Sequence, residues 1–206
     1  MPTRRQLAAL VILRFSLDQA RQAALRQRIV LLTLSVLLLV TGCAAMKPAD
    51  FAKSPNTLVL EEYFAGNTRA WGLFEDRFGR VRRQFTVDIA GHWDGESLTL
   101  DEFFQYDDGE TERRTWTIRK RPDGRYDGTA GDVVGTAQGE AAGNALNWSY
   151  VMDLKVGDGT LRVAFDDWMF LQPGGVVINR ARVSKWGLEL GQVTLFFMKP
   201  EAKAAS

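Results

Sequence analysis

Cys43 is the residue of this sequence whose surroundings point most directly to a chemistry. It follows the small residues Thr41 and Gly42, which end an apolar run of 12 residues, Ile29–Val40, preceded by arginines. This is the order of a secretory signal peptide: a positive region, an apolar region and small residues at the cleavage site. The thiol of Cys43 could accept a diacylglycerol through a thioether bond. We therefore predict a signal peptide over residues 1–42 and a lipid anchor on Cys43.

The residues around Cys43 also indicate a destination. The tetrapeptide Val40–Cys43 resembles the lipobox of bacterial lipoproteins, and their sorting preference makes Ala44 indicative of an outer-membrane protein that faces the periplasm. The alternative is an uncleaved anchor, because Ile29–Met46 has 18 residues and is just long enough to cross a bilayer. An anchor has no reason to end in this tetrapeptide. A translation start near Leu25 would suit a signal peptide better than the first residue, because arginines would then lead straight into the apolar run.

A second group of candidate residues is polar but falls on rows that are otherwise apolar. In Leu161–Leu171 every second residue is apolar except Asp167. A break of this kind in a pattern is where function tends to lie. The hairpin pairing given below sets Glu102 opposite Arg114, and sets Asp167 opposite two residues, Tyr150 and Arg182.

These polar residues have two interpretations. They could hold the head group of a hydrophobic ligand, with Arg182 binding an anionic group and Trp148, Met152, Phe165 and Met169 forming the walls. They could instead form salt bridges that close one end of the domain, since an unpaired buried ion costs several kcal/mol. The sequence leaves both open.

Other chemistries have weaker support. His92 precedes a tight turn and should point outward, and Asp107, Asp108 and Glu110 suit a hairpin loop better than a metal site. No serine elbow, zinc motif, phosphate loop or cysteine cluster occurs. We therefore assign no catalytic residue, metal or cofactor. From Cys43 onward the chain has 20 basic and 24 acidic residues, which argues against nucleic acid as a partner.

Turn signals position these residues on long strands. Ser54 and Pro55 predict a short helix over residues 55–64. Beyond Ala70 the pattern becomes β, with strands of about ten to twelve residues, longer than usual. Such a meander predicts an all-β, antiparallel up-and-down barrel. The turn signals are Asp94-Gly95, Asp108-Gly109, Asp123-Gly124, Gly143-Asn144, Asp158-Gly159, Gly174-Gly175 and Trp186-Gly187.

Pairing the strands across these turns places large side chains together on one face, the face expected to be inside. The pairs are Ile89 with Leu100, Phe85 with Phe104, Leu100 with Trp116, Leu98 with Ile118, Trp116 with Ala130, Trp148 with Gly139, Tyr150 with Ala137, Leu154 with Val163, Met152 with Phe165 and Trp148 with Met169.

The segment from Arg82 to Phe197 resembles a family of bacterial lipoproteins, domain of unknown function 3833. The residues that carry the resemblance are FTVDIAGHWDG from Phe85, LDEFFQYDDGE from Leu100, GNALNW from Gly143, FDDWMFLQ from Phe165 and the run from Lys185 to Phe197. The resemblance implies a lipocalin-like barrel on an outer-membrane lipoprotein, and it carries over no catalytic residue.

These observations predict a domain order and a function. A lipidated tether over residues 43–53 should lead into one barrel domain over 54–199, followed by a disordered tail over 200–206. We expect the barrel to bind or shuttle a hydrophobic ligand, a fatty-acyl lipid, with the membrane as its other partner. Two alternatives stay open. One is a lipid-modifying enzyme that uses Glu102 or Asp167 as acid or base; the other is a structural component of an envelope complex with a filled barrel. A cavity of about 300 Å³ or more would favour binding or catalysis.

Overall fold

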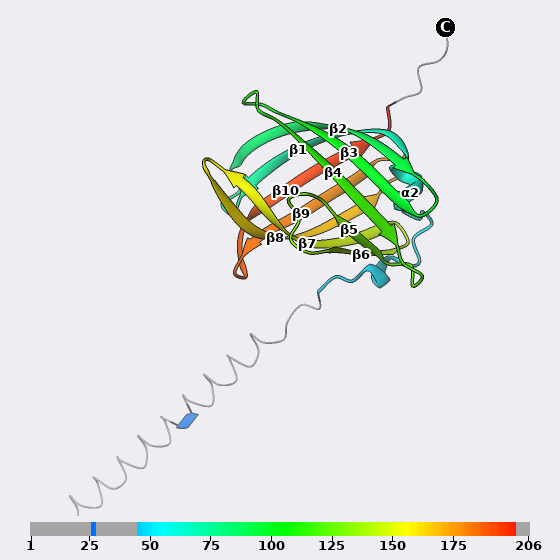
Figure 1. Cartoon of the computed structure of the whole chain (residues 1–206). Coiled ribbons are helices and arrows are strands. Elements are labelled where there is room, and N and C mark those ends of the chain that lie inside the picture. Colours follow the sequence, from blue (N-terminus) through cyan, green and yellow to red (C-terminus); the bar gives the residue numbers. More distant parts are fainter. Residues whose placement is uncertain (1–25, 28–44, 201–206) are drawn as a thin grey trace, which may run out of the picture. The chain divides into compact units, whose positions relative to one another are not determined.

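A closed barrel of ten antiparallel strands forms the body of the protein (Figure 1). The computed structural model describes residues 26–27 and 45–200, and Cys43 lies outside them. The chain divides into two compact units, Met1–Ala45 and Met46–Ser206, and the second contains the barrel. Each strand pairs with its neighbours in sequence and β1 pairs with β10, so the predicted up-and-down barrel is confirmed. The strands are β1 Gly66–Asp76, β2 Val81–Trp93, β3 Ser97–Tyr106, β4 Thr111–Lys120, β5 Tyr126–Thr129, β6 Ala137–Ala142, β7 Ala145–Val156, β8 Gly159–Leu171, β9 Val177–Lys185 and β10 Leu188–Met198.

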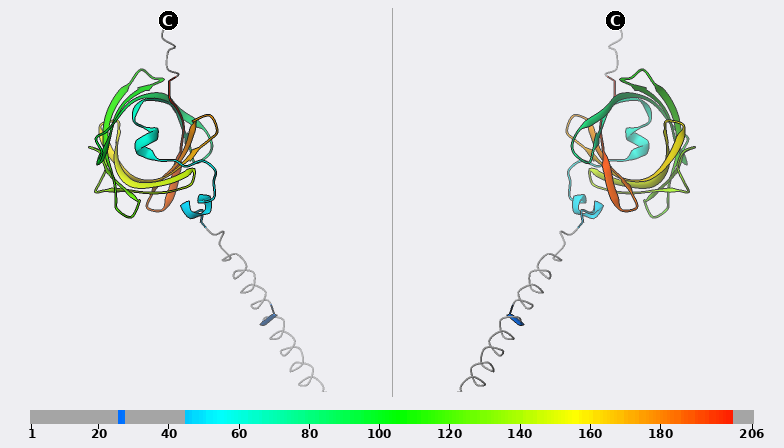
Figure 2. Two further views of the ribbon diagram at one scale, coloured as in Figure 1. Left: turned by 90° about the vertical axis from the view of Figure 1, so that its right-hand side faces the viewer. Right: turned by 90° about the vertical axis from the view of Figure 1, so that its left-hand side faces the viewer.

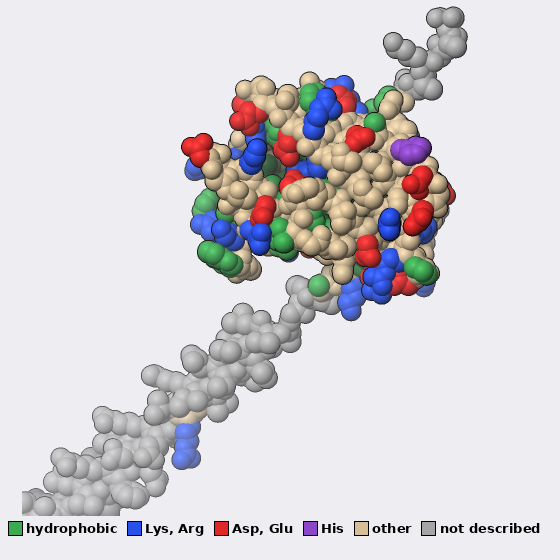
Figure 3. All heavy atoms as spheres, viewed as in Figure 1, with side chains coloured by type: hydrophobic (Ala, Val, Ile, Leu, Met, Phe, Trp, Pro, Cys, Tyr) green, Lys and Arg blue, Asp and Glu red, His purple; other side chains and the backbone are tan. Residues whose placement is uncertain are grey.

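The strands arise from alternation between inward and outward side chains. In β9, Val177, Asn179, Ala181 and Val183 are buried, and the residues between them are exposed. An inward row of this kind is the mark of a strand with one face in the interior. The outward rows carry charges of both signs, which are spread over the barrel wall (Figure 3).

The helix before the barrel is shorter than the sequence predicts. Instead of spanning residues 55–64, α2 is the single turn Leu60–Tyr63. The backbone N–H of Leu58 donates to the carbonyl of Gly143 at 2.8 Å, which holds this part of the chain extended against the barrel. A 3-10 turn, η1, covers Pro48–Phe51, where a tether was expected. No helix in the described part of the chain is long and apolar enough to cross a membrane.

The predicted pairing is confirmed in the β3–β4 and β6–β7 hairpins, whereas the β2–β3 and β7–β8 hairpins differ from it by two residues. Leu100 pairs with Trp116, and Gly139 with Trp148, as expected. In the β2–β3 hairpin, Ile89 pairs with Glu102 instead of Leu100. The carboxylate of Asp94 accepts the N–H groups of residues 96 and 97, which makes a four-residue loop where a two-residue loop was expected. A shift of two residues leaves every side chain on its predicted face.

The β7–β8 hairpin shows the same two-residue shift. Its turn is Gly157-Asp158 instead of Asp158-Gly159, because Val156 pairs with Gly159. Met152 consequently faces Val163, and Trp148 faces Asp167. These four residues remain on the inner face of the barrel, so the predicted interior survives the change of partners.

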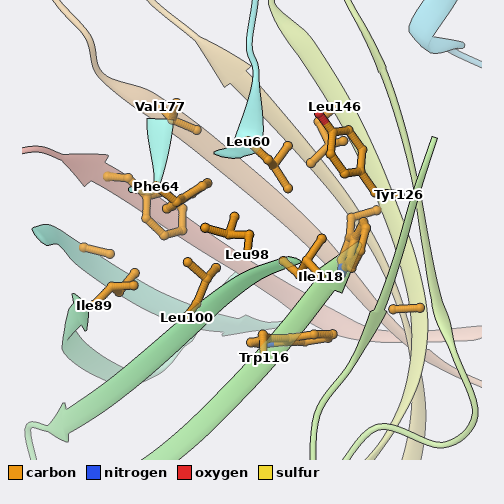
Figure 4. Close-up of a cluster of buried hydrophobic side chains, with 14 of the residues drawn as sticks. Leu60, Phe64, Ile89, Leu98, Leu100, Trp116, Ile118, Tyr126, Leu146 and Val177 are labelled. Atoms are coloured by element: carbon orange, nitrogen blue, oxygen red, sulfur yellow. The ribbon is translucent and has the colours of Figure 1, made fainter. Parts of the chain in front are cut away.

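One end of the barrel is closed by α2, which lies inside the ring of strands (Figure 2). Leu60 and Phe64 are buried there, and the Phe64 ring meets Phe197 edge-on at 5.5 Å. Gly91 permits this approach, since a Cβ at that position would lie 1.8 Å from the carbonyl oxygen of Phe64. Figure 4 shows the side chains packed around this plug, which include Leu98, Leu100, Ile118, Tyr126, Leu146 and Val177.

Candidate functional site

The barrel is hollow beyond the plug. A cavity of about 1680 Å³ extends from Leu60 and Phe64 to the hairpin turns at the opposite end, where Arg83, Glu110 and Val156 line it. We call that end the mouth. The right-hand view of Figure 2 looks through the mouth toward α2. Ligand pockets are commonly about 300–1,000 Å³. The interior is therefore above the threshold of about 300 Å³ that distinguishes a binding or catalytic barrel from a filled, structural one.

Aromatic side chains form one wall of the cavity. Trp116 meets Trp148 at 6.0 Å and Tyr150 at 5.4 Å, both edge-on, and Phe165 stacks on Tyr150 at 4.9 Å. Large rings fit here because glycine lies beneath one of them: a Cβ on Gly139 would come 2.2 Å from the Trp148 ring. The wall is thus preformed for an apolar molecule.

A charged cluster lies on the same wall, nearer the mouth than Trp116. Glu102 and Arg114 are cross-strand partners, as predicted, with 3.8 Å between Oε2 and Nη1. Arg114 also donates to Glu112 at 2.7 Å and to Asp132 at 2.8 Å. Burial raises the pKa of Glu102 to about 7, although Arg114 counteracts it. Burial opposes the charge on Arg114, yet the carboxylates of Glu102, Asp132 and Glu112 raise its pKa above the ordinary value.

Asp132 reaches this cluster because the two strands of the barrel wall next to β4 and β7 are short. β5 and β6 have only 4 and 6 residues, and the chain between them runs as a loop beside β7. Val133 in that loop makes an isolated bridge to Met152. Arg114 therefore ties the loop to β4 across the gap. Loop residues show no periodicity, so Asp132 could not be recognised as a site residue from the sequence.

Asp167 is buried and points into the cavity, as predicted. It is not a cross-strand partner of Tyr150, which pairs with Phe165, but the Tyr150 hydroxyl donates to its Oδ2 at 3.2 Å. Its Oδ1 has no hydrogen-bond partner among the described residues. Burial raises the pKa of Asp167 to about 8, outweighing the opposing effect of the bond from Tyr150. At neutral pH this carboxyl group is largely protonated and can donate a hydrogen bond.

Asn179 is a polar residue of the cavity that sequence reasoning missed. It is fully buried, and neither its amide oxygen nor its amide nitrogen has a partner in the described part of the chain. Asp167 pairs with Ala181 and Met169 with Asn179, so Asp167 and Asn179 are diagonal neighbours on the inner face. The sequence pattern did not single out Asn179, because one polar residue in an otherwise apolar row is common in strands. A buried amide without partners is costly, and it marks a place where a ligand could supply the missing bonds.

Arg182 is the one candidate that the structure places on the wrong side. It lies on the outer face, with a side chain 61% exposed, and its Nε is 3.1 Å from Glu189. The residue opposite it on β8 is Asp166, not Asp167. The loop between β8 and β9 has five residues, closed by a bond from Gln172 N–H to Val176, instead of the two expected. The register thereby moves by an odd number of residues, which turns Arg182 outward.

The remaining candidates do not join the cavity chemistry. His92 is exposed, as expected. The described residues contain no group of three or more His, Cys, Asp or Glu side chains placed to hold a metal. In the β3–β4 turn, Asp108 and Glu110 both pair with Arg83. The arrangement is typical of a hairpin loop braced by an arginine.

The comparisons with known proteins identify a family for the chain and leave its function open. No curated protein matches the chain. The model of one protein family, described as "Protein of unknown function (DUF3833)", matches residues 37–199. The match covers the whole barrel and most of the sequence, so the chain belongs to the DUF3833 family.

Proposed function

We propose that the barrel binds a hydrophobic molecule with a fatty-acyl chain and holds or passes it on in the cell envelope. The observation that carries this proposal is the cavity of about 1680 Å³, which has an aromatic wall and unpartnered polar atoms inside it. Apolar walls with a few convergent polar groups are the usual composition of small-molecule sites. An acyl chain would lie along Trp116, Trp148 and Phe165.

The polar group of the ligand is expected to be neutral, such as an ester, amide or hydroxyl. Asp167 in its protonated form can donate one hydrogen bond, and Asn179 can donate and accept. The anionic head group first expected at Arg182 has no support, because that residue is outside the barrel.

The proposal includes a lipid anchor on Cys43 and a place in the outer membrane, facing the periplasm. It rests on the tetrapeptide Val40–Cys43 after an apolar run. Replacing Cys43 by serine should move the protein out of the outer-membrane fraction, because the acyl chains contribute about 0.8 kcal/mol per buried methylene. Sucrose-gradient fractionation of cells measures this. Unchanged outer-membrane recovery of Cys43→Ser would contradict the anchor.

Ligand binding can be tested by filling the cavity. Ala181 is buried on the inner face of β9, whereas Ala164 is exposed on the outer face of β8. Ala181→Trp should reduce uptake of the fluorescent apolar probe N-phenylnaphthylamine at least about tenfold, because the added ring occupies the volume of the probe. Ala164→Trp adds the same ring outside and should bind as wild type. Equal uptake by both variants, with unchanged melting temperatures, would end the proposal.

The same probe tests the polar group. In Asn179→Leu the buried amide is gone, so the empty protein should melt at the same or a higher temperature. Displacement of the probe by a fatty-acid methyl ester should nevertheless weaken by about tenfold, because the ester loses a hydrogen-bond partner. If the methyl ester displaced the probe from Asn179→Leu as well as from wild type, Asn179 would not belong to the ligand site. Recovery of the ester in hydrolysed form would favour the enzyme alternative, for which Glu102 and Asp167 have pKa values near neutrality.

A further inference from the structure

The mouth carries apolar side chains on three of its hairpin turns. Phe78 in the β1–β2 turn is 73% exposed, and Trp186 in the β9–β10 turn is 90% exposed. Val156, the last residue of β7 before the β7–β8 turn, and Leu188, the first residue of β10, are also more than half exposed. The strand order β2-β1-β10-β9-β8-β7 makes these three turns neighbours around the ring. We call them the rim turns.

Trp186 has an unusual backbone conformation for a tryptophan. Its φ is 52°, and it is the only residue other than glycine with a positive φ in the described part of the chain. A bulky side chain in this conformation is uncommon and costs free energy. The rim turns thus maintain, at a cost, a large aromatic ring in water. Exposed aromatic residues at a protein's edge are characteristic of contact with another surface.

Basic residues accompany these apolar tips. Lys185 Nζ lies 4.7 Å from the Trp186 ring, and the guanidinium of Arg77 lies 4.8 Å from the Phe78 ring. The segment from Asp76 to Arg82 has three arginines and one acid. Figure 3 shows hydrophobic and basic side chains together at the lower left, where the β9–β10 hairpin of Figure 1 ends. Aromatic rings beside basic side chains are the composition that binds the interface of an anionic bilayer.

The acidic residues of the mouth are placed away from this surface or paired. Asp107, Asp108 and Glu110 belong to the β3–β4 turn, which is not a rim turn, and the last two pair with Arg83. Asp76 accepts bonds from its own turn, and Glu189 pairs with Arg182. Glu75 and Asp158 are the remaining acids at these hairpin ends, and they are outnumbered by Arg77, Arg80, Lys155 and Lys185. The rim turns therefore present an excess of positive charge.

We propose that the rim turns dock the mouth of the barrel onto the surface of an anionic lipid bilayer, so that an acyl chain can pass between the bilayer and the cavity. This inference rests on the proposed binding function. Phe78 and Trp186 would enter the interface, with Arg77 and Lys185 at the level of the lipid phosphates. The ligand would then enter past the apolar tips of the rim turns and pass the charged cluster around Arg114 before it reaches the aromatic wall.

The docking can be measured with the chain that starts at Met46, because Met46–Ser206 is a compact unit with its buried core entirely after residue 57. It should sediment with vesicles of phosphatidylcholine and phosphatidylglycerol, and less with phosphatidylcholine alone. The double variant Phe78→Ser with Trp186→Ser should bind at least about tenfold more weakly, because two rings no longer leave water. Arg77→Gln with Lys185→Gln should lose the preference for phosphatidylglycerol.

The control is Trp71→Ser, which removes a partly exposed tryptophan from the outer wall of β1, away from the mouth. It should bind vesicles as wild type does. If the wild-type protein bound neither kind of vesicle, the proposal would be overturned and a protein partner for the rim turns would be indicated. A loss of vesicle binding in Trp71→Ser as large as that in the double rim variant would also overturn it. Uptake of N-phenylnaphthylamine without vesicles separates the two ideas. The rim variants should take up the probe as wild type does. If wild type did not take up the probe, the binding function would be refuted and the docking would not.

Discussion

Replacing Arg114 by alanine should lower the free energy of unfolding by about 3–5 kcal/mol, the largest loss that we expect from any single charge. The side chain is only 14% exposed, and it contacts Glu102, Glu112 and Asp132. Without it, these carboxylates face one another in a poorly hydrated wall. Urea denaturation of both proteins measures the difference.

The pH dependence of this loss has a definite sign. In Arg114→Ala the pKa of Glu102 should rise further above its unfolded value, so the folded state binds more protons than the unfolded state. Stability then falls as pH rises, and the destabilisation should be smaller at about pH 5 than at about pH 8. Arg113→Ala is the matched control, since Arg113 is exposed on the same strand over the ring of Phe103. Similar losses for Arg113→Ala and Arg114→Ala would show that the cluster is not stabilising.

Trp116→Ala should cost about 3 kcal/mol of unfolding free energy, the lower end of the range for such truncations. Trp116 is buried among Leu100, Trp148 and Tyr150, but one side of its ring borders the cavity and has fewer contacts to lose. The same change should enlarge the cavity and let it accept bulkier acyl esters. Thermal melting and displacement of N-phenylnaphthylamine give the two values.

Trp71→Ala provides the comparison for that truncation. Trp71 meets Phe196 at 6.3 Å on the outer face and is partly exposed, so its removal should cost less than about 1.5 kcal/mol. If Trp71→Ala were as damaging as Trp116→Ala, the inner face would not be the main source of stability. If Trp116→Ala did not change the free energy of unfolding, Trp116 would not be packed in the aromatic wall as described.

The fold could be predicted from the sequence because errors of two residues in a hairpin do not change which side chains face inward. The β2–β3 and β7–β8 hairpins both slipped in this way, and Glu102, Trp148 and Asp167 still reached the interior. The β8–β9 hairpin slipped by an odd number, and Arg182 was lost from the site. Turn residues reveal where a chain reverses, but hydrogen bonds such as those of Asp94 determine how many residues the loop takes.

The candidate site was only partly predictable. The pair Glu102 and Arg114 follows from register, whereas Asp132 reaches Arg114 from a loop that has no periodic pattern. The cavity could not be predicted from the alternation of inward and outward residues either, because this alternation is the same in a filled and in a hollow barrel. What keeps this barrel open is the size of its ring of ten strands together with a plug of one helical turn at one end only.

The place where the chain joins the barrel gives the molecule a polarity. Phe51 of η1 packs on Trp168 and Phe170 beside the β6–β7 turn, which is at the closed end. Three residues lie between Cys43 and Lys47, and the four Cα–Cα steps span at most about 14 Å when the chain is fully extended. If Cys43 carries the anchor, the base of the barrel is held close to its own membrane and the mouth opens on the far side. An anchored barrel would therefore present its opening away from the lipid that holds it, and its cavity would be loaded from the opposite side.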